Sequence, residues 1–194
     1  MLYNASEKEK NMFKNKKIVI GVSGGIASYK VASLVSVLHK EGASVQVIMT
    51  KHATQFISPL TLQTLSKNKV IVDMFEEDNA EYVGHIHFGQ DCDLIVIVPA
   101  TANIIGKSAN GIADDMLTST IIAANKPILF VPSMNEVMYQ NPIVQDNIAK
   151  LQKYGYHFLQ PDNGMLACGV IGKGKLPKTE RIIEEMKKVL MEEI

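Results

Sequence analysis

Two glycines follow the first apolar segment of the chain, in a position that suits the binding of an anion. Residues 17–22 form an apolar run that predicts a strand, and Ser23-Gly24-Gly25-Ile26 comes next, before a helix-forming segment. Glycine at such a turn lets backbone N–H groups approach a negatively charged ligand, and the amino end of the next helix adds positive potential. We therefore expect an anion site at Ser23–Ile26. The alternative is a tight turn that needs glycine only for its backbone.

Small and polar residues also follow three other apolar runs. They are Thr50, Thr101-Ala102-Asn103 and Ser133-Met134-Asn135. If the runs are parallel strands, their carboxyl ends gather at the sheet edge where open α/β sheets bind ligands. A phosphate would then bind at the glycine turn, beside a flatter wall of small residues. Flavin mononucleotide (FMN) fits this description, and a nucleotide or a sugar phosphate fits nearly as well.

Two common nucleotide-binding motifs are incomplete in this chain. The dinucleotide fingerprint G-x-G-x-x-G, begun at Gly21, fails at Ser23. Gly106-Lys107-Ser108 resembles the end of a P-loop, but the first glycine of that motif falls on Thr101. The sequence therefore argues against binding of a nucleoside triphosphate.

A structural zinc site is not expected either. His85, His87 and Cys92 are close in the sequence, but this short group has no matching fourth ligand. The methionines are interpreted as core residues, because their flexible side chains commonly fill gaps in packing.

Alternating strands and helices must position the clusters at the strand ends. Apolar runs without alternation predict strands that are buried on both faces of a parallel sheet. Strands are expected over residues 17–22, 45–49, 94–98, 128–131 and 157–159, with 70–72 as a short strand or an edge. Helices are expected over 31–38 with an end near Gly42, around 52–56 and 59–65, over about 112–124, and over 143–154 and 182–190. Asp114 and Asp115 would lie in the first turn of the helix over 112–124. This alternation predicts an α/β fold with a doubly wound parallel sheet and right-handed crossovers.

Composition and charge narrow the class of protein. The 194 residues suffice for one domain, and the formal net charge of +0 offers no basic excess for nucleic acid or an anionic membrane. The two cysteines are too few for a disulfide scaffold, so a cytoplasmic location is expected. No apolar run is long enough for a membrane span. Residues 1–15 lack the apolar segment of a secretory signal and are expected to be a flexible or peripheral extension of a single domain over 16–194.

Four sequence blocks resemble the FMN-dependent cysteine decarboxylase family in their order and spacing. They are KIVIGVSGGIASYK, GHIHFG with PATANIIGKSANGIADD, PSMNEVMYQNP and GMLACGVIGKGKL, within residues 16 to about 177. The resemblance implies a flavodoxin-like or Rossmann-like three-layer sandwich, assembled as a homotrimer or a multiple of trimers with FMN between subunits. The blocks match best those members that convert 4′-phosphopantothenoylcysteine to 4′-phosphopantetheine in coenzyme A biosynthesis.

The same resemblance implies roles for individual residues. The FMN contacts of the family fall on Gly24, Gly25, Ile26, Thr50, Thr101, Ala102, Asn103, Ile104 and Ser133. The substrate contacts fall on Asn135, Ala167, Gly169 and Lys175. The catalytic histidine falls on His85 and the catalytic cysteine on Cys168.

The chemistry explains why such an enzyme needs a flavin. Loss of CO2 from an N-acylated cysteine would leave an unstabilised carbanion. Oxidation of the thiol-bearing carbon to a thioaldehyde creates an electron sink, and the enethiol that remains after CO2 loss takes hydride back from the reduced flavin. By resemblance, His85 handles a proton in the first half of the reaction, Asn135 holds the substrate carboxylate, and Cys168 donates a proton in the second half.

Two residues depart from the family pattern. Val170 stands where aspartate is frequent, and Lys175 stands where arginine is frequent. Lysine lacks the planar fork that recognises an anion bidentately, so these departures bear on substrate choice.

Three other functions remain as alternatives. They are an oxidative decarboxylase of a carboxy-terminal peptide cysteine, a flavin prenyltransferase, and a flavin-binding regulatory subunit without turnover. The presence of Cys168 argues against the first function. The Pro-x-Met-Asn and Ala-Cys-Gly blocks argue against the second, and the intact catalytic residues argue against the third.

Many bacterial members of the family carry a carboxy-terminal synthetase domain. Nothing of that length follows Ile194. We therefore expect a standalone enzyme, with a separate phosphopantothenoylcysteine synthetase as a partner, or a piece of a bifunctional protein.

Overall fold

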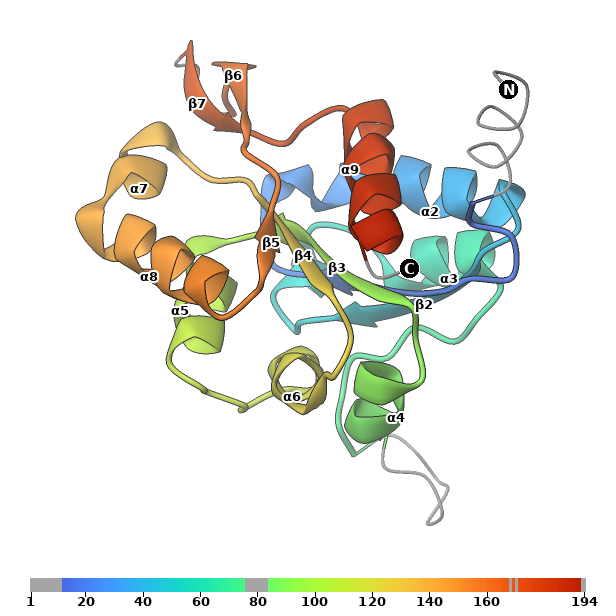
Figure 1. Cartoon of the computed structure of the whole chain (residues 1–194). Helices are drawn as coiled ribbons and strands as arrows, with labels where there is room; N and C mark the ends of the chain where they lie inside the picture. Colours follow the sequence, from blue (N-terminus) through green and yellow to red (C-terminus); the bar gives the residue numbers. More distant parts are fainter. Residues whose placement is uncertain (1–11, 76–83, 168, 170, 193–194) are drawn as a thin grey trace, which may run out of the picture.

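A five-stranded parallel sheet runs through the centre of the molecule (Figure 1). The computed structural model describes residues 12–75, 84–167, 169 and 171–192. The strands are β1 (Lys17–Val22), β2 (Ser44–Met49), β3 (Leu94–Ala100), β4 (Ile128–Pro132) and β5 (His157–Phe158). Their order across the sheet is β2-β1-β3-β4-β5, and every pairing within this sheet is parallel. The predicted doubly wound α/β class is confirmed.

Residues 70–72 form an edge of this sheet and not a full strand. Ile71 makes an isolated parallel bridge with Ile48 of β2. The Met49 N–H donates to the Ile71 carbonyl oxygen at 2.8 Å, and the Ile71 N–H donates to the Val47 carbonyl oxygen at 3.0 Å. These residues therefore pair with the carboxyl half of β2. Of the two interpretations, a short strand or an edge, the structure supports the edge.

β3 lies at the centre of the sheet, as its uninterrupted apolar sequence predicts. All of its residues are buried. Leu94, Val96 and Val98 belong to the core on one face, whereas Ile95 and Ile97 belong to the core on the other face. Because successive side chains of a strand point to opposite faces, a strand with helices on both sides has no position that favours a polar residue.

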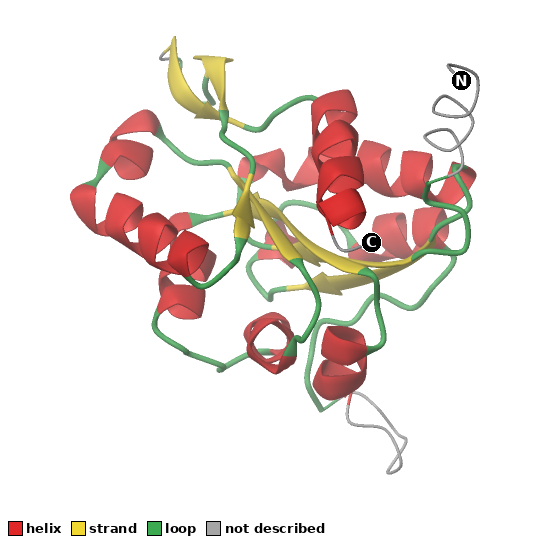
Figure 2. Ribbon diagram, viewed as in Figure 1, coloured by secondary structure: helices red, strands yellow, loops and turns green. Residues whose placement is uncertain are grey.

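Helices cover both faces of the sheet and complete the three layers (Figure 2). One face packs against α2 (Val31–Lys40), α3 (Pro59–Ser66) and α9 (Thr179–Glu192). The other face packs against α4 (Gly84–Gln90), α5 (Ala102–Ala109), α6 (Met116–Ala123) and α8 (Pro142–Lys153). The shorter helical segments are η1 (Ile26–Lys30), η2 (Ala53–Gln55) and α7 (Glu136–Gln140). None of the described helices has the length and apolar character that a membrane crossing requires.

The single helix predicted over about 112–124 is wrong at its start. Residues 112–124 contain α6, with Asp115 as its N-cap, whereas α5 lies before this range and was not predicted. Asp115 Oδ1 accepts from the Thr118 N–H at 2.8 Å, and Thr118 Oγ1 accepts from the Asp115 N–H at 3.0 Å. This reciprocal pair is a capping box. Asp114 and Asp115 therefore precede the helix and do not lie in its first turn.

A small antiparallel hairpin, which the sequence analysis did not predict, stands apart from the central sheet (Figure 1, top). It consists of β6 (Asp162–Met165) and β7 (Ile171–Lys175). The Met134 N–H donates to the Gly174 carbonyl oxygen at 3.0 Å. A Cβ atom at residue 174 would lie 2.1 Å from the Met134 carbonyl oxygen, so this close contact requires glycine. The β6–β7 hairpin is thus docked on the segment that follows β4.

The prediction for the amino terminus needs a correction at Phe13. This side chain, in the predicted flexible or peripheral extension over residues 1–15, is 0% exposed and belongs to the core beneath α2 and α9. Lys187 Nζ of α9 lies 5.6 Å from the centre of its ring. A single aromatic residue in a charged segment has no periodicity from which its burial could be predicted. Residues 1–11 lie outside the described part of the chain.

Candidate functional site

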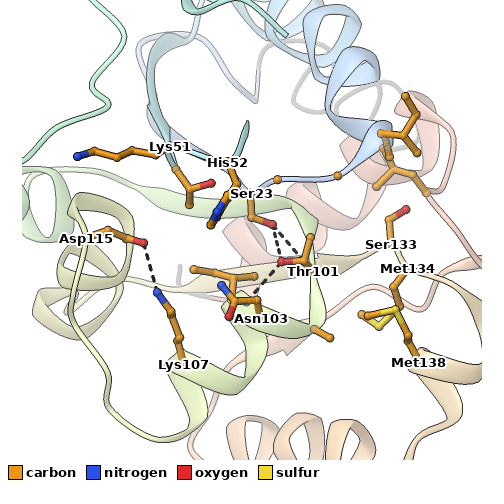
Figure 3. A pocket seen from close by; sticks show the side chains of 18 of the residues that line it. Ser23, Lys51, His52, Thr101, Asn103, Lys107, Asp115, Ser133, Met134 and Met138 are labelled. Carbon is orange, nitrogen blue, oxygen red and sulfur yellow. Dashed lines mark hydrogen bonds and ion pairs between the residues drawn. The ribbon is translucent and has the colours of Figure 1, made fainter. Parts of the chain in front are cut away.

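A cavity of about 1390 Å³ opens at the carboxyl edge of the sheet, among the turns that follow β1, β2, β3 and β4 (Figure 3). The order of strands reverses at this edge, because the chain passes from β1 to β2 on one side and then returns to β3 on the other side. Open α/β sheets bind their ligands at such a switch point. The cavity therefore lies where the polar residues at the strand ends predict it.

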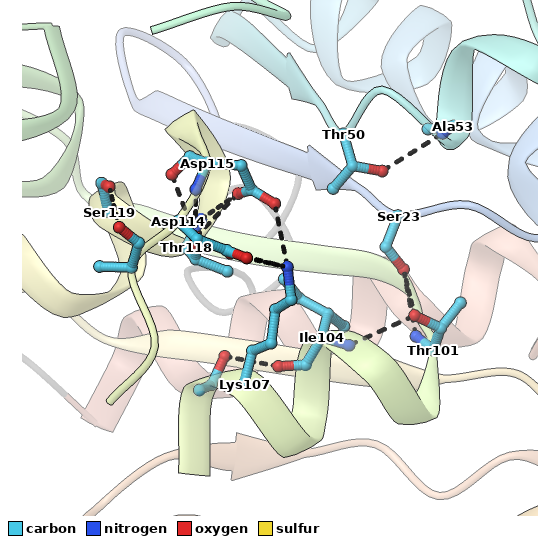
Figure 4. Close-up of polar contacts among 12 residues, drawn as sticks. Ser23, Thr50, Ala53, Thr101, Ile104, Lys107, Asp114, Asp115, Thr118 and Ser119 are labelled. Carbon is cyan, nitrogen blue, oxygen red and sulfur yellow. Dashed lines mark hydrogen bonds and ion pairs between the residues drawn. The ribbon is translucent and has the colours of Figure 1, made fainter. Parts of the chain in front are cut away.

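Ser23 and Thr101 join the ends of β1 and β3 at this switch point (Figure 4). The buried Ser23 Oγ donates to the Pro99 carbonyl oxygen at 2.7 Å and accepts from the Thr101 N–H at 3.1 Å. Ser23 Oγ and Thr101 Oγ1 are 3.0 Å apart. Thr101 is also the N-cap of α5, since its Oγ1 accepts from the Ile104 N–H at 3.4 Å. The two hydroxyl groups thus fix the turn after β1 relative to the turn after β3.

The turn after β1 packs closely against His52 only because Gly24 has no side chain. A Cβ atom on Gly24 would lie 2.5 Å from the His52 Cβ atom. The buried Ser28 Oγ donates toward the carbonyl oxygens of Ser23 and Gly25, at 3.0 and 2.6 Å, and so holds the turn from inside the fold. The first N–H groups of a helix have no partner within the helix. The backbone N–H groups of this turn are therefore candidate donors to an anion.

α5 brings Asn103 and Lys107 to the same side of the cavity, four residues apart. Lys107 Nζ lies 2.7 and 2.8 Å from the two carboxylate oxygens of Asp114, and 3.9 Å from Asp115 Oδ2. The hydrogen bond from Lys107 lowers the pKa of Asp114. Lys107 is therefore neutralised by the segment before α6, and it braces that segment against α5.

Asn135 follows β4 and faces the cavity from the amino end of α7. Its Oδ1 accepts from the Val137 N–H at 2.9 Å, the bond of an N-cap. This bond orients the side-chain amide, and Nδ2 is the group with which it can donate to an anion. Met134 and Met138 add apolar surface beside Ser133 (Figure 3). The site thus places an amide N–H that can donate to an anion next to the apolar side chains of the two methionines.

All nine residues expected to contact FMN line this cavity. They are Gly24, Gly25, Ile26, Thr50, Thr101, Ala102, Asn103, Ile104 and Ser133. Among the residues expected to contact substrate, Asn135, Ala167 and Lys175 line it and Gly169 does not. Cys168 and Val170 lie outside the described residues. Residues from four strand ends and from the β6–β7 hairpin thus meet in one place.

The expected catalytic histidine, His85, does not line the cavity of its own chain. It lies near the start of α4, a helix that packs closely on α6. A Cβ atom on Gly89 of α4 would lie 3.0 Å from the Thr120 carbonyl oxygen of α6, which shows how near the two helices are. One chain therefore does not bring His85 together with Asn135.

The cavity also includes residues that the sequence analysis did not assign, among them Lys30, Lys51, His52 and Met138. Lys51 and His52 directly follow Thr50. The sequence analysis would have included them if it had taken the next two residues after this strand as well. Lys30 lies about one helical turn after Ile26. This spacing could have predicted that both side chains lie on the same side of the helical segment, toward the cavity. Among the described residues, no group of three or more His, Cys, Asp or Glu side chains could hold a metal ion.

A family model described as Flavoprotein matches residues 6–191 of the chain. The Bacillus subtilis protein named "Coenzyme A biosynthesis bifunctional protein CoaBC" is 49% identical over 182 residues, which cover 94% of this chain and 45% of that protein. The Streptococcus mutans protein named "Probable phosphopantothenoylcysteine decarboxylase" is 45% identical over 177 residues, which cover 90% of this chain and 99% of that protein. The chain thus spans less than half of the bifunctional relative and nearly all of the shorter one.

Solved structures share the fold. The FMN-dependent cysteine decarboxylase SpaF superposes with a TM-score of 0.81 at 26% identity, over 93% of this chain and 98% of that chain. A PPC decarboxylase mutant complexed with pantothenoylaminoethenethiol superposes with a TM-score of 0.80 at 28% identity, over 93% of this chain and 100% of that chain. Both structures agree with the three-layer α/β architecture described above.

Proposed function

Because the chain belongs to the Flavoprotein family, we propose that it binds FMN in the cavity and decarboxylates 4′-phosphopantothenoylcysteine to 4′-phosphopantetheine for coenzyme A biosynthesis. The observation that carries this proposal is the meeting of all nine expected FMN contacts with Asn135 around one cavity. The names of the relatives in Bacillus subtilis and Streptococcus mutans support the choice of substrate.

FMN fits the residues that are present. The glycine turn at Ser23–Ile26 offers backbone donors for the phosphate, and the segment Thr101–Ile104 offers a wall of small side chains for the ring. When bound, the flavin supplies the reversible two-electron oxidation of the thiol-bearing carbon, so that the carboxylate departs from an activated substrate. The protein's own contribution is to bind and orient the two molecules.

Asn135 holds the substrate carboxylate in this proposal. Its Oδ1 is occupied by the Val137 N–H, so the amide presents Nδ2 to the ligand in a fixed orientation. Met134 and Met138 line the same cavity and would add apolar surface beside the carboxylate. A neutral donor in apolar surroundings binds the anion while leaving it free to depart as CO2, which a cation would oppose more strongly.

His85 and Cys168 complete the site through their proton chemistry. We assign to His85 a proton transfer in the oxidation or decarboxylation half, and to Cys168 the donation of a proton in the reduction half. Cys168 lies outside the described residues. A cysteine thiol, with an ordinary pKa of about 8.5, is in general a much better proton donor than a serine hydroxyl.

A homotrimer, or a multiple of trimers, brings His85 of one subunit to the cavity of the next. Two observations support it: His85 does not line the cavity of its own chain, and the packed helices α4 and α6 expose Ile86 (42%) and Ile122 (46%). Exposed aliphatic side chains on neighbouring helices are typical of a subunit interface. Light scattering should give a trimer, and a stable monomer that binds FMN tightly would contradict the shared site.

The decisive experiment follows the fate of the substrate under nitrogen. The purified protein should be yellow, and it should convert 4′-phosphopantothenoylcysteine to 4′-phosphopantetheine without any added reductant. Mass spectrometry identifies the product. A product two hydrogens short of 4′-phosphopantetheine would favour the oxidative peptide-cysteine decarboxylase instead. A colourless protein that FMN does not reconstitute would contradict the proposal.

The Cys168→Ser variant divides the same reaction into its halves. We expect it to release CO2 and to stop at the enethiol, because only the second half needs the cysteine proton. Wild-type protein serves as the control. Complete turnover by the variant would remove Cys168 from the proposed mechanism.

A synthetase that supplies the substrate is the expected metabolic partner. The Bacillus subtilis relative is named bifunctional, and less than half of its length matches this chain. We propose that the remaining activity is provided by another domain or another protein.

A further inference from the structure

A second cavity of about 500 Å³ adjoins the first one. It lies among the start of α2, the base of the β6–β7 hairpin and the start of α9. Lys30, Lys175 and Leu176 line both cavities, so the two spaces meet along these side chains. A long ligand whose one end lies near Asn135 can therefore extend into the second cavity.

The second cavity is lined by three lysines whose charges the described structure leaves uncompensated. They are Lys30, Lys175 and Lys178. None of the ion pairs among the described residues includes any of these three side chains. Like charges around one small space repel each other, and a bound anion would relieve that repulsion.

Two carboxylates also line the second cavity, but they do not cancel this charge. Asp162 pairs with Arg181. Glu180 and Lys178 are both exposed to solvent, so solvent screens these two opposite charges to a similar extent. The net charge of the lining residues together with Arg181 remains positive, because four cationic side chains face two carboxylates.

The hairpin makes room for one of the lysines. Lys175 lies across Gly164, so that a Cβ atom on Gly164 would be 3.0 Å from Lys175 Cδ and 3.3 Å from its Nζ. Any other residue at 164 would push this side chain aside. The half-buried ammonium group is thereby kept at the border between the two cavities.

We propose that the second cavity binds the phosphate monoester of the substrate, with Lys30, Lys175 and Lys178 as its cationic contacts. The inference rests on the proposed function, since 4′-phosphopantothenoylcysteine carries a carboxylate at one end and a phosphate at the other. Lysine ammonium groups are effective point charges for phosphate. Three of them compensate for the planar fork that an arginine at position 175 would provide.

The phosphate of FMN is a second source of the same chemistry. Lys30 lies only four residues after Ile26, at the glycine turn, and it lines both cavities. Lys178, in contrast, lines only the second cavity. Variants of these two lysines therefore distinguish a substrate phosphate from a flavin phosphate.

The test compares kcat/KM for 4′-phosphopantothenoylcysteine with kcat/KM for pantothenoylcysteine, which lacks the phosphate. Wild-type protein should prefer the phosphorylated substrate. Lys178→Met should reduce this preference about tenfold, chiefly through KM, since a charge-assisted hydrogen bond contributes about 1.5 kcal/mol and 1.4 kcal/mol corresponds to a factor of ten. Lys153→Met removes an exposed lysine from α8 as a matched control, and its preference should equal that of wild type. Glu180→Gln should raise the preference, because it removes a carboxylate from the cavity.

The possible outcomes separate the hypotheses. Flavin content, measured by absorbance, should be unchanged in Lys178→Met and Lys30→Met. An unchanged preference in Lys178→Met, or an equal loss for both substrates, would overturn the inference. Loss of flavin from Lys30→Met with an unchanged preference would assign Lys30 to the FMN phosphate and overturn its place in this subsite. If wild-type protein turns over neither substrate, the proposed function itself fails.

Discussion

The hydroxyl oxygens of Ser23 and Thr101 lie 3.0 Å apart, although the two residues are 78 positions apart in the chain. They connect β1 and β3 where the order of the strands reverses. The same two residues begin the glycine turn and α5, the two segments proposed to bind the phosphate and the ring of FMN. The stability of the fold and the shape of the cavity therefore depend on the same contact.

Ser23→Ala should weaken both the fold and the binding of flavin. It removes the donor to the Pro99 carbonyl oxygen and the acceptor of the Thr101 N–H, both in a buried place. Leaving such groups without a partner costs about 1–3 kcal/mol. Chemical denaturation measures the loss of stability. Ser44→Ala, at an exposed position of β2, is the control and should change stability by less than about 0.5 kcal/mol.

Gly24→Ala should lower the flavin content of the purified protein, and it should also lower the stability of the fold. The new methyl group would lie 2.5 Å from the His52 Cβ atom and would force the turn away from η2. Overpacking of this kind costs about 1–3 kcal/mol. Gly106→Ala in α5 is the control, because the nearest atom to its new Cβ is 3.8 Å away. The control should keep its flavin and gain up to about 1 kcal/mol from helix propensity. Equal flavin content in both variants would show that the turn does not hold the phosphate.

Asn135→Asp should abolish turnover and leave the flavin in place. Aspartate caps a helix as well as asparagine does, so α7 is preserved. The substitution nevertheless replaces the N–H donor with a negative charge that faces the substrate carboxylate. We expect a loss of about 100-fold or more in kcat/KM, since a like charge at a desolvated contact costs several kcal/mol.

Asn141→Asp provides the matched control for Asn135→Asp. Asn141 caps α8 with the same type of bond, to the Ile143 N–H at 2.9 Å, and it does not line the cavity. Its activity should stay close to that of wild type. If the two variants are equally active, Asn135 does not anchor the carboxylate.

Cys92 should be inert toward thiol reagents in the folded protein. Burial raises the pKa of its thiol from 9.0 to about 12, and the side chain is only 7% exposed. At pH 8 the thiolate fraction is then about a thousandfold below that of an unperturbed cysteine. Labelling with iodoacetamide in the Cys168→Ser background, with and without denaturant, measures the difference. Rapid labelling of the folded variant would contradict this burial.

The same shift of the pKa predicts an effect of alkaline pH on stability. The unfolded chain loses the Cys92 proton near pH 9, whereas the folded chain keeps it until about pH 12. The contribution of this thiol to stability is therefore complete below pH 9 and falls as the pH rises above 9.

The sequence was sufficient for the central sheet and for most of the cavity. The strands could be predicted because each is a nearly uninterrupted apolar run, and the cavity because polar residues end four of these runs. α5 was missed entirely, since Thr101 and the small residues after it are as typical of a loop as of a capped helix. The β6–β7 hairpin was missed because Gly164, Gly172 and Gly174 leave no alternation of polar and apolar residues.

The position of His85 illustrates a different limit. The helix α4 that carries His85 was not predicted, and His85 does not line the cavity of its own chain. Phe13 shows the same limit within one chain, since its burial depends on Lys187 and on α9, far away in the sequence. Contacts between distant segments require the folded arrangement.

The β6–β7 hairpin is held to the domain by the bond from the Met134 N–H to Gly174 and by Glu136, whose Oε1 accepts from the Lys173 N–H at 3.1 Å. These contacts lie outside the ladder of the central sheet. In hydrogen-exchange terms, the Met134 amide can exchange during a local opening, whereas the amides of β3 exchange only when the whole domain unfolds. Substitutions that remove these contacts should therefore speed exchange at Met134 and leave exchange in β3 unchanged.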